Sequence, residues 1–124
     1  KMYMNSIQAQ ICLNNFKTFE KKMSSLQDLV NTYNRELGYD NSSSHLYRIE
    51  VTDNHKFINK MKEYKIVCGV HYSALHLNDV YNNGNEFICK KSEKLQSRTV
   101  SLPMNESLTE NEIEYIINTV RRNL

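Results

Sequence analysis

Apolar residues recur every three or four positions through the first third of the chain. From Ile7 to Leu37 this spacing predicts one helix, in which a single turn of the apolar stripe is missing near Asn15. Gly38 follows and is a typical helix stop. A helix of about 30 residues is about 45 Å long, whereas a globule of this chain length is about 35 Å across. We therefore expect the helix to extend beyond its own domain, either packed along another domain or subunit or exposed in its N-terminal half.

After a polar linker, the period of the pattern changes from 3.6 to two. Alternating apolar residues predict a half-buried strand at Tyr47–Val51. Thr52 or Asp53 can cap the helix that follows, and its apolar side would consist of Phe57, Ile58, Met61 and Tyr64. The apolar run Ile66–Tyr72 predicts a second strand.

The last third of the chain predicts two further helices and one strand. We expect a short helix at Glu86–Leu95 and a strand at Thr99–Leu102, which Pro103 ends. Thr109 and Glu112 form a capping box at the start of a final helix, whose apolar residues are Ile113, Ile116, Ile117, Val120 and Leu124. The expected fold class is α+β, with a long N-terminal helix and a small, three-stranded, mainly antiparallel sheet covered by helices.

The composition indicates one soluble domain. With 124 residues, 40% of them hydrophobic, the chain can form a single core. The 16 basic and 14 acidic residues give a net charge of +2, which does not favour a nucleic-acid partner. The sequence contains neither a membrane-spanning run nor a secretory signal, so we expect a cytoplasmic protein without a membrane partner. Because the chain begins at Lys1 without an initiator methionine, we expect it to be a piece of a longer protein.

Cysteine and histidine residues occur together in the middle of the chain. Cys68, His71, His76 and Cys89 are possible zinc ligands by type, but they lack the paired spacing of zinc-binding motifs. Three cysteines without C-x-x-C spacing also argue against a disulfide framework. No metal site is predicted, and the residues favour a buried cysteine beside a loop with two polar histidines.

The segment Gly69–Leu77 is the candidate functional loop. It carries two imidazoles, His71 and His76, and the phenol of Tyr72 at the end of a predicted strand. Loops at such positions often hold functional groups. The residues alone leave open whether these side chains bind a ligand or only form hydrogen bonds with a neighbouring loop.

Five blocks of the sequence share their order and spacing with a known enzyme family. Residues 4–9 (MNSIQA) resemble the motif M-[TSN]-[DE]-I-Q-A, and residues 69–77 (GVHYSALHL) resemble G-[VI]-H-Y-x-P-L-H-L. The other three blocks are an H-x-[YF] strand at 45–49, a P-x-[AS]-E glutamate at Glu93 and an L-S-L-P-x-x-x-x-L-T segment at 100–109. Together they resemble the C-terminal portion of the DegT/DnrJ/StrS family of pyridoxal-phosphate-dependent sugar aminotransferases.

This resemblance implies the small domain of a fold type I pyridoxal-phosphate enzyme. Residues 1–38 would form the interdomain helix and residues 39–124 the C-terminal small domain, without the large cofactor-binding domain. In the family, a large-domain lysine forms a Schiff base with the cofactor, and an amino group passes from glutamate to a nucleotide-linked keto sugar for polysaccharide or glycoconjugate biosynthesis. No lysine here matches that motif. The fragment is therefore expected to be inactive and to bind no cofactor by itself. The resemblance also implies that the parent enzyme is a homodimer.

The resemblance also assigns roles to five residues. Lys1 and Tyr3 fall in the segment that reaches the cofactor phosphate of the neighbouring subunit, although Tyr3 replaces the usual Asn or Arg. His71 and Tyr72 match a pair that borders the sugar-nucleotide pocket, where an imidazole and a phenol can donate hydrogen bonds to substrate oxygens. His76 is expected either to contact the substrate or to support the loop. No catalytic residue is predicted in this chain.

Two alternatives to the aminotransferase remain open at this point. The first is a dehydratase of the same family, in which the Schiff-base lysine is replaced. The second is a stand-alone α+β binding or regulatory module without a cofactor. The module interpretation predicts a monomer whose first helix packs wholly on its own sheet.

Overall fold

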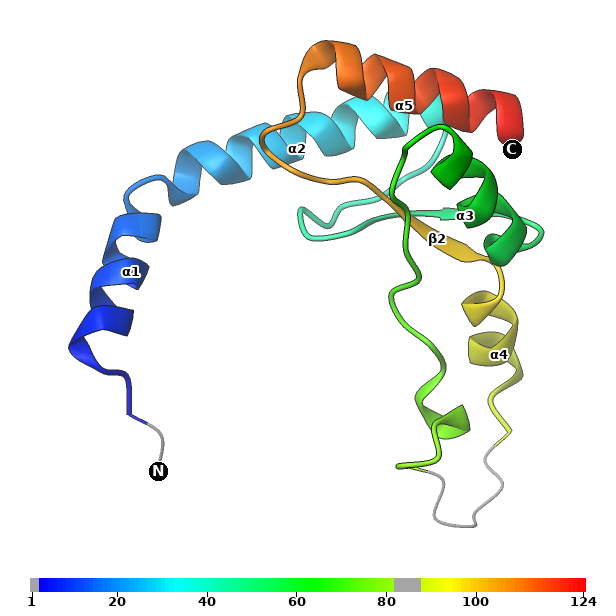
Figure 1. Ribbon diagram of the computed structural model, residues 1–124, viewed down its shortest axis with the longest axis horizontal. Coiled ribbons are helices and arrows are strands. Elements are labelled where there is room, and N and C mark those ends of the chain that lie inside the picture. Colours follow the sequence, from blue (N-terminus) through cyan, green and yellow to red (C-terminus); the bar gives the residue numbers. More distant parts are fainter. Residues whose placement is uncertain (1–2, 82–87) are drawn as a thin grey trace.

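The computed structural model describes residues 3–81 and 88–124, and Figure 1 shows how their elements are arranged. The described residues form five α-helices, one short 3-10 helix (η1) and two strands. In chain order these are α1 (Ser6–Phe16), α2 (Phe19–Leu37), β1 (Tyr47–Glu50), α3 (Asn54–Glu63), η1 (Leu75–Leu77), α4 (Lys90–Gln96), β2 (Thr99–Leu102) and α5 (Glu110–Asn123). The α+β class predicted from the sequence is confirmed.

The sheet has two antiparallel strands in the described residues, not the three that were predicted. In the register of β1 and β2, Tyr47 lies opposite Leu102 and Glu50 lies opposite Thr99. Tyr47 and Ile49 are buried, whereas the alternate residues of β1 are exposed. The period-two pattern therefore correctly predicted which face of β1 belongs to the core.

The predicted strand at Ile66–Tyr72 is wrong. Only Gly69 pairs with the sheet, through two backbone hydrogen bonds with Ser101 of 3.1 and 2.7 Å. Just before it the backbone turns back on α3, because the Ile66 amide donates to the Met61 carbonyl at 3.0 Å. The segment thus touches the sheet at one residue and then leaves it as a loop. An apolar run by itself does not distinguish this course from a continuous strand.

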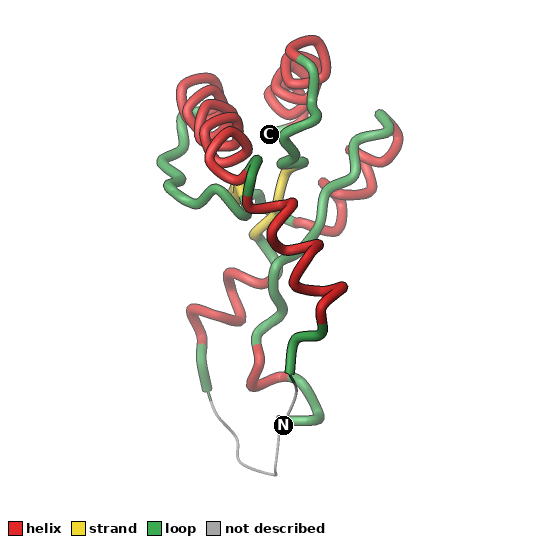
Figure 2. The backbone as a smooth tube through the Cα atoms, turned by 90° about the vertical axis from the view of Figure 1, so that its left-hand side faces the viewer, coloured by secondary structure: helices red, strands yellow, loops and turns green. Residues whose placement is uncertain are grey.

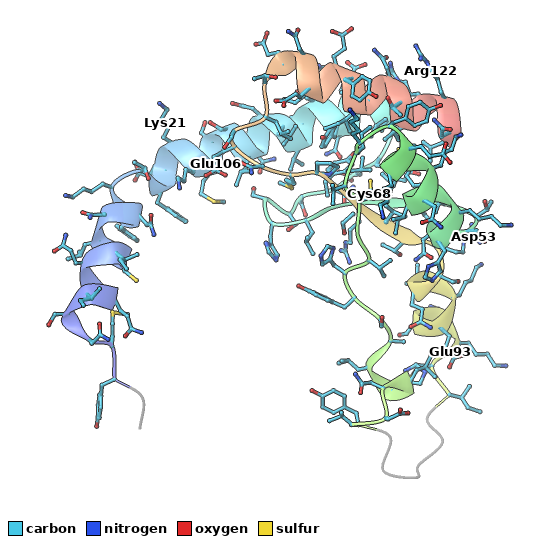
Figure 3. All side chains as sticks on the ribbon, viewed as in Figure 1. Lys21, Asp53, Cys68, Glu93, Glu106 and Arg122 are labelled. Carbon is cyan, nitrogen blue, oxygen red and sulfur yellow. The ribbon has the colours of Figure 1, made fainter. Side chains whose placement is uncertain are left out.

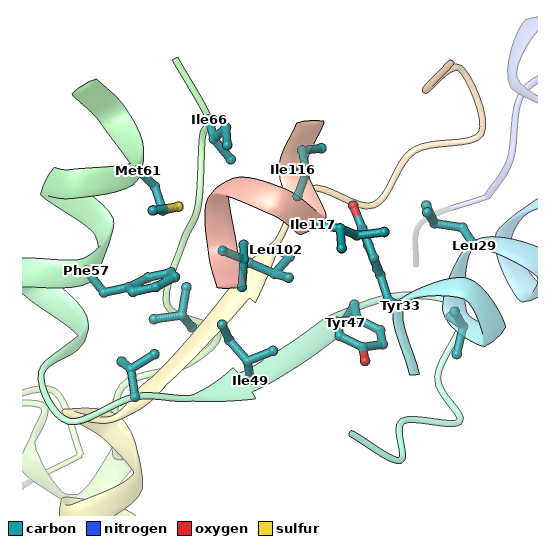
Figure 4. Packing of buried hydrophobic residues seen from close by; sticks show 14 residues of the cluster. Leu29, Tyr33, Tyr47, Ile49, Phe57, Met61, Ile66, Leu102, Ile116 and Ile117 are labelled. Carbon is teal, nitrogen blue, oxygen red and sulfur yellow. The ribbon is translucent and has the colours of Figure 1, made fainter. Parts of the chain in front are cut away.

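One hydrophobic core lies between the sheet and the helices α2, α3 and α5 (Figure 4). The rings of Tyr33 and Tyr47 pack together where α2 meets β1, with ring centroids 4.8 Å apart. The remaining buried members of this cluster are Leu29, Val30, Ile49, Val51, Phe57, Met61, Ile66, Val100, Leu102, Ile116, Ile117 and Val120. These helices cover one face of the sheet and leave the opposite face available for a site.

The first predicted helix is in fact two helices. α1 ends at Phe16 and α2 begins at Phe19, so the break at Lys17–Thr18 falls next to the missing turn of the apolar stripe. The amide and the hydroxyl of Thr18 each donate to the Asn15 carbonyl at 3.2 Å, which closes a tight turn. The predicted stop at Gly38 is confirmed, since this residue has a left-handed φ of 74°.

Two arms project from the same side of the body in both views (Figures 1 and 2). One arm is α1, and the other contains η1, α4 and the loops that join them to the sheet. No residue of α1 is buried, and it leaves large apolar side chains in solvent: Ile7 is 73% exposed and Phe16 is 76% exposed. Apolar exposure on this scale is expected for a helix made to pack against another surface.

Local signals placed the starts of two other helices. Asp53 caps α3 by accepting a hydrogen bond from the Lys56 amide at 3.0 Å, and the capping box of Thr109 and Glu112 is present at the start of α5. α4 begins at Lys90, and the predicted start at Glu86 lies outside the described residues. Among the helices of residues 3–81 and 88–124, none combines the length and the apolar character needed to cross a membrane.

Candidate functional site

Three contacts hold the loop between Gly69 and Leu77 against the rest of the domain. At its start, Gly69 forms an isolated β-bridge with Ser101 of β2. In its middle, the Ala74 amide donates to the side-chain oxygen of Gln96 on α4 at 2.8 Å. Near its end, Nε2 of His76 lies 2.9 Å from a carboxylate oxygen of Glu93, which Figure 3 labels on α4. The loop is therefore fixed to both the sheet and α4.

An open hollow of about 500 Å³ lies between this loop, α4 and the outer face of the sheet. We call it the loop hollow. Its lining includes Arg48, His71, Tyr72, His76, Gln96 and Thr99. The loop hollow brings together all three side chains that the resemblance assigned to substrate binding.

His71 lies directly over Gly69. A Cβ atom at Gly69 would meet Cε1 of the His71 ring at 2.9 Å, so the absence of a side chain there makes room for the imidazole. The ring stands edge-on to that of Tyr72, with centroids 5.2 Å apart. Nδ1 of His71 is buried and has no hydrogen-bond partner in the described part of the chain. A buried polar atom of this kind usually has a partner, so the imidazole has unused capacity for a hydrogen bond.

Tyr72 and His76 have different environments. Tyr72 is exposed, so its hydroxyl is available to a ligand. The side chain of His76 is only 11% exposed and donates to Glu93, whose carboxylate also accepts from the Cys89 amide at 3.0 Å. These hydrogen bonds, that of His76 first, hold the pKa of Glu93 below its usual range. His76 therefore joins the loop to α4, whereas Tyr72 faces solvent.

The other residues singled out in the sequence are not gathered at the loop hollow. Lys1 lies outside the described residues, and Tyr3 stands on the α1 arm with 80% of its surface exposed. In residues 3–81 and 88–124, no group of three or more histidine, cysteine or acidic residues could hold a metal ion. Cys68 is partly buried against the core, and burial raises the pKa of its thiol to about 11.

Two residues of the loop hollow were missed by sequence reasoning. Arg48 lies at an exposed position of β1, between the buried Tyr47 and Ile49. Period-two alternation could have placed it on the face opposite the core. Gln96 gives no comparable signal, because its role depends on the way α4 packs beside a loop about twenty residues earlier in the chain.

A protein-family model matches residues 1–121 and is described as the DegT/DnrJ/EryC1/StrS aminotransferase family. The chain belongs to this family. No curated protein matches it by sequence. The resemblance drawn from the five sequence blocks is therefore confirmed.

Solved structures of sugar aminotransferases and related enzymes share the fold. A DegT/DnrJ/EryC1/StrS aminotransferase from Brucella abortus is 25% identical, with a TM-score of 0.84 over 96% of this chain. The aminotransferase PseC from Helicobacter pylori, which is involved in the biosynthesis of pseudoaminic acid, is 21% identical with a TM-score of 0.87 over 98% of this chain. The aminotransferase TlmJ from Streptoalloteichus hindustanus is 18% identical with a TM-score of 0.87 over 97%.

The chain spans only about a third of the length of these relatives: 35% of the Brucella protein, 38% of PseC and 36% of TlmJ. It therefore corresponds to one part of a DegT-family enzyme. The stand-alone module interpretation required a first helix packed wholly on its own sheet. That prediction is contradicted by α1, which has no buried residue.

Full-length members of the DegT family use pyridoxal phosphate. Of the two residues expected to approach its phosphate, Lys1 lies outside the described residues and Tyr3 is 80% exposed. Tyr3 does not line the loop hollow.

The contact of His76 with Glu93 predicts how firmly the loop is held. In Glu93→Gln the charge-assisted hydrogen bond becomes a neutral one, which is about half as strong. We expect hydrogen exchange of the Ala74 amide to become about three- to tenfold faster, because this amide reports the neighbouring contact with Gln96. Glu63→Gln, which removes an exposed pairing with Lys60 on α3, is the matched control. Equal exchange rates in the two variants would show that the pair does not hold the loop.

Proposed function

We propose that this chain is the connecting helix and small domain of a pyridoxal-phosphate-dependent sugar aminotransferase. Residues 1–38 form the interdomain segment and residues 39–124 the small domain. The observation that carries this proposal is the family match over residues 1–121 combined with an α1 arm whose apolar side chains lie in solvent. A large domain packed on α1 would bury that apolar surface, which includes Met4, Ile7, Ile11, Leu13 and Phe16.

The reaction proposed for the parent enzyme is transfer of an amino group from glutamate to a nucleotide-linked keto sugar, for polysaccharide or glycoconjugate biosynthesis in the cytoplasm. When bound, pyridoxal phosphate supplies the electron sink for this reaction. The residues of this chain bind and orient the sugar substrate. The exposed hydroxyl of Tyr72 and the imidazole of His71 can donate hydrogen bonds to sugar or phosphate oxygens.

The parent enzyme is proposed to be a homodimer. Lys1 and Tyr3 would then approach the cofactor phosphate of the neighbouring subunit, as the resemblance implies. The exposure of Tyr3 supports this assignment, because 80% of its surface is free to meet another subunit. His76 would act mainly by holding the loop through Glu93.

The test of this function uses the longer protein that includes the upstream region. We expect an absorbance band at about 400 nm from the lysine-bound cofactor. We also expect glutamate-dependent amination of a nucleotide-linked keto sugar. A folded full-length chain without this band would contradict the proposal. A large domain without the lysine would support the dehydratase alternative.

Substitutions in the loop hollow test the substrate assignment in the same protein. His71→Ala should lower kcat/KM for the sugar by about 10- to 100-fold and Tyr72→Phe by about tenfold, since each removes a hydrogen bond to the substrate. Tyr64→Phe, which alters a tyrosine at the end of α3, is the control and should leave kcat/KM unchanged. The half-reaction with glutamate should be affected less than the sugar half-reaction. Equal loss in both would contradict a role in sugar binding.

A further inference from the structure

We propose that Arg48 is the anion anchor of the loop hollow, where it binds the phosphate groups of the nucleotide-linked substrate. The identity of the ligand rests on the proposed function, whereas the anion site rests on the residues of this chain. None of the sequence blocks shared with the family assigned a role to this arginine. The argument comes from its orientation, the charges around it and its position in the sheet register.

The side chain of Arg48 lies on the open face of the sheet. Its neighbours Tyr47 and Ile49 are buried in the core, so Arg48 points the other way. On the same face, Glu50 forms an ion pair of 3.0 Å with Arg98. No hydrogen bond or ion pair joins the guanidinium of Arg48 to a side chain in residues 3–81 or 88–124. This face therefore retains one uncompensated positive charge among its described residues.

The lining of the loop hollow favours an anion. The described residues of this lining include one arginine and two histidines, but no aspartate or glutamate. The carboxylate of Glu93 on α4 is engaged by His76 and by the Cys89 amide, and it does not line the loop hollow. A cationic ligand would find no opposite charge among the described residues of these walls. A phosphate oxygen would find a guanidinium, which binds such groups through two parallel hydrogen bonds.

The sheet register places Arg48 and His71 at the same site. Arg48 lies opposite Ser101 on β2, and Gly69 bridges the same Ser101 from its other side. Since neighbouring strands are about 5 Å apart, the backbones of Arg48 and Gly69 are about 10 Å apart. The imidazole of His71 covers Gly69. The arginine and the histidine thus flank one short span of the sheet, within their combined reach of a single ligand.

The backbone of Arg48 is held in place before any ligand arrives. The side chain of Asn41 donates to the Arg48 carbonyl at 2.9 Å and accepts from its amide at 3.3 Å. These bonds occupy the edge of β1 that does not face β2. A rigid attachment point lowers the entropy lost when the arginine binds an anion. With Arg48 on the phosphate groups, His71 and Tyr72 remain available for the sugar.

Titrations with defined probes test this inference. Inorganic pyrophosphate, uridine diphosphate and uridine are titrated into the 124-residue chain, and also into the longer protein, while amide chemical shifts or heat are recorded. We expect the two phosphates to bind, with shifts centred on Arg48, His71 and Thr99. We expect Arg48→Gln to lower the affinity for pyrophosphate and for uridine diphosphate by about tenfold or more, because a charge-assisted pair is lost. Arg48→Lys should bind with intermediate affinity, since it keeps the charge but not the planar fork.

Control variants and probes decide how each result is interpreted. Arg122→Gln removes the same charge from the end of α5, outside the loop hollow (Figure 3), and should change the affinity less than about twofold because surface charges at that distance are screened. Equal pyrophosphate affinity in Arg48→Gln and the unaltered protein would overturn the inference, as would the absence of pyrophosphate binding. Pyridoxal phosphate serves as a further probe. If its binding depends on Arg48 while the binding of uridine diphosphate does not, the assignment of this site to the nucleotide would be overturned. These readouts need no turnover, so they are separate from the test of the aminotransferase activity.

Discussion

Replacing Asn54 by alanine is expected to lower the free energy of unfolding by about 2–3 kcal/mol. Asn54 begins α3 and is only 1% exposed. Its side-chain amide donates to the carbonyls of Gln96 at 2.6 Å and Thr99 at 3.2 Å, and its backbone amide donates to the Ser97 carbonyl at 3.0 Å. Alanine would leave two carbonyls at the α4–β2 turn without this donor, in a place that water reaches poorly.

Chemical denaturation of Asn54→Ala and Asn59→Ala measures this contribution. Asn59 lies on the same helix but is exposed, so its substitution should change the free energy of unfolding by less than about 0.5 kcal/mol. Gln96 accepts from Asn54 through its backbone carbonyl and from the Ala74 amide through its side chain. Loss of the first bond should therefore also make hydrogen exchange of the Ala74 amide faster in the Asn54 variant. A loss below about 1 kcal/mol would show that water replaces the missing donor at this turn.

The second large effect is a loss of stability at alkaline pH. Burial raises the pKa of Cys68 from 9.0 to about 11 and that of Tyr47 from 10.0 to about 12, and it also raises the pKa of Tyr33. In each case the folded state holds its proton more tightly than the unfolded state. The resulting stability is fully present below the unfolded pKa and disappears as the pH rises through the folded value. We expect the midpoint of urea unfolding to fall progressively from about pH 9 to pH 12.

The two core tyrosines provide a matched pair of variants. The hydroxyl of Tyr47 is buried without a partner among the described residues, whereas the hydroxyl of Tyr33 donates to the Pro103 carbonyl at 3.0 Å. Tyr47→Phe should therefore leave the stability at pH 7 unchanged or higher, while Tyr33→Phe should lose about 1 kcal/mol. At pH 12, Tyr47→Phe should recover about 2–3 kcal/mol relative to the unaltered chain, since its unfolded state no longer gains free energy by ionising this phenol. Identical alkaline unfolding of Tyr47→Phe and the unaltered chain would contradict this account.

Much of the fold was predictable because its signals are local. The alternation around Tyr47 and Ile49 identified both a strand and its buried face. The capping residues Asp53 and Thr109 marked the starts of α3 and α5, since a cap satisfies backbone donors only a few residues away. The five sequence blocks correctly indicated the family because each is a short motif at a defined spacing.

The errors in the predicted fold arose where a choice depends on contacts beyond the local pattern. The helix predicted from Ile7 to Leu37 breaks at Thr18, whose hydroxyl donates to the Asn15 carbonyl, and no residue of α1 is buried. The apolar run from Ile66 has the composition of a strand, yet β2 accepts only Gly69 as a partner. Periodicity reports which residues avoid water, but it does not report which backbone donors find acceptors.

The amino-acid sequence by itself determined the α+β class, the family and the buried face of β1, and it singled out the His71–Tyr72 loop as the candidate site. These follow from residue type and from spacing over a few positions. Only the tertiary structure decided that His76 meets Glu93 and that Arg48 shares a hollow with His71. Those pairings join residues 17 to 23 positions apart in the chain. Arg48 and His71 meet because β2 pairs with β1 on one side and with Gly69 on the other, through backbone hydrogen bonds that carry no sequence signature. The contact of His76 with Glu93 depends instead on how the loop packs beside α4.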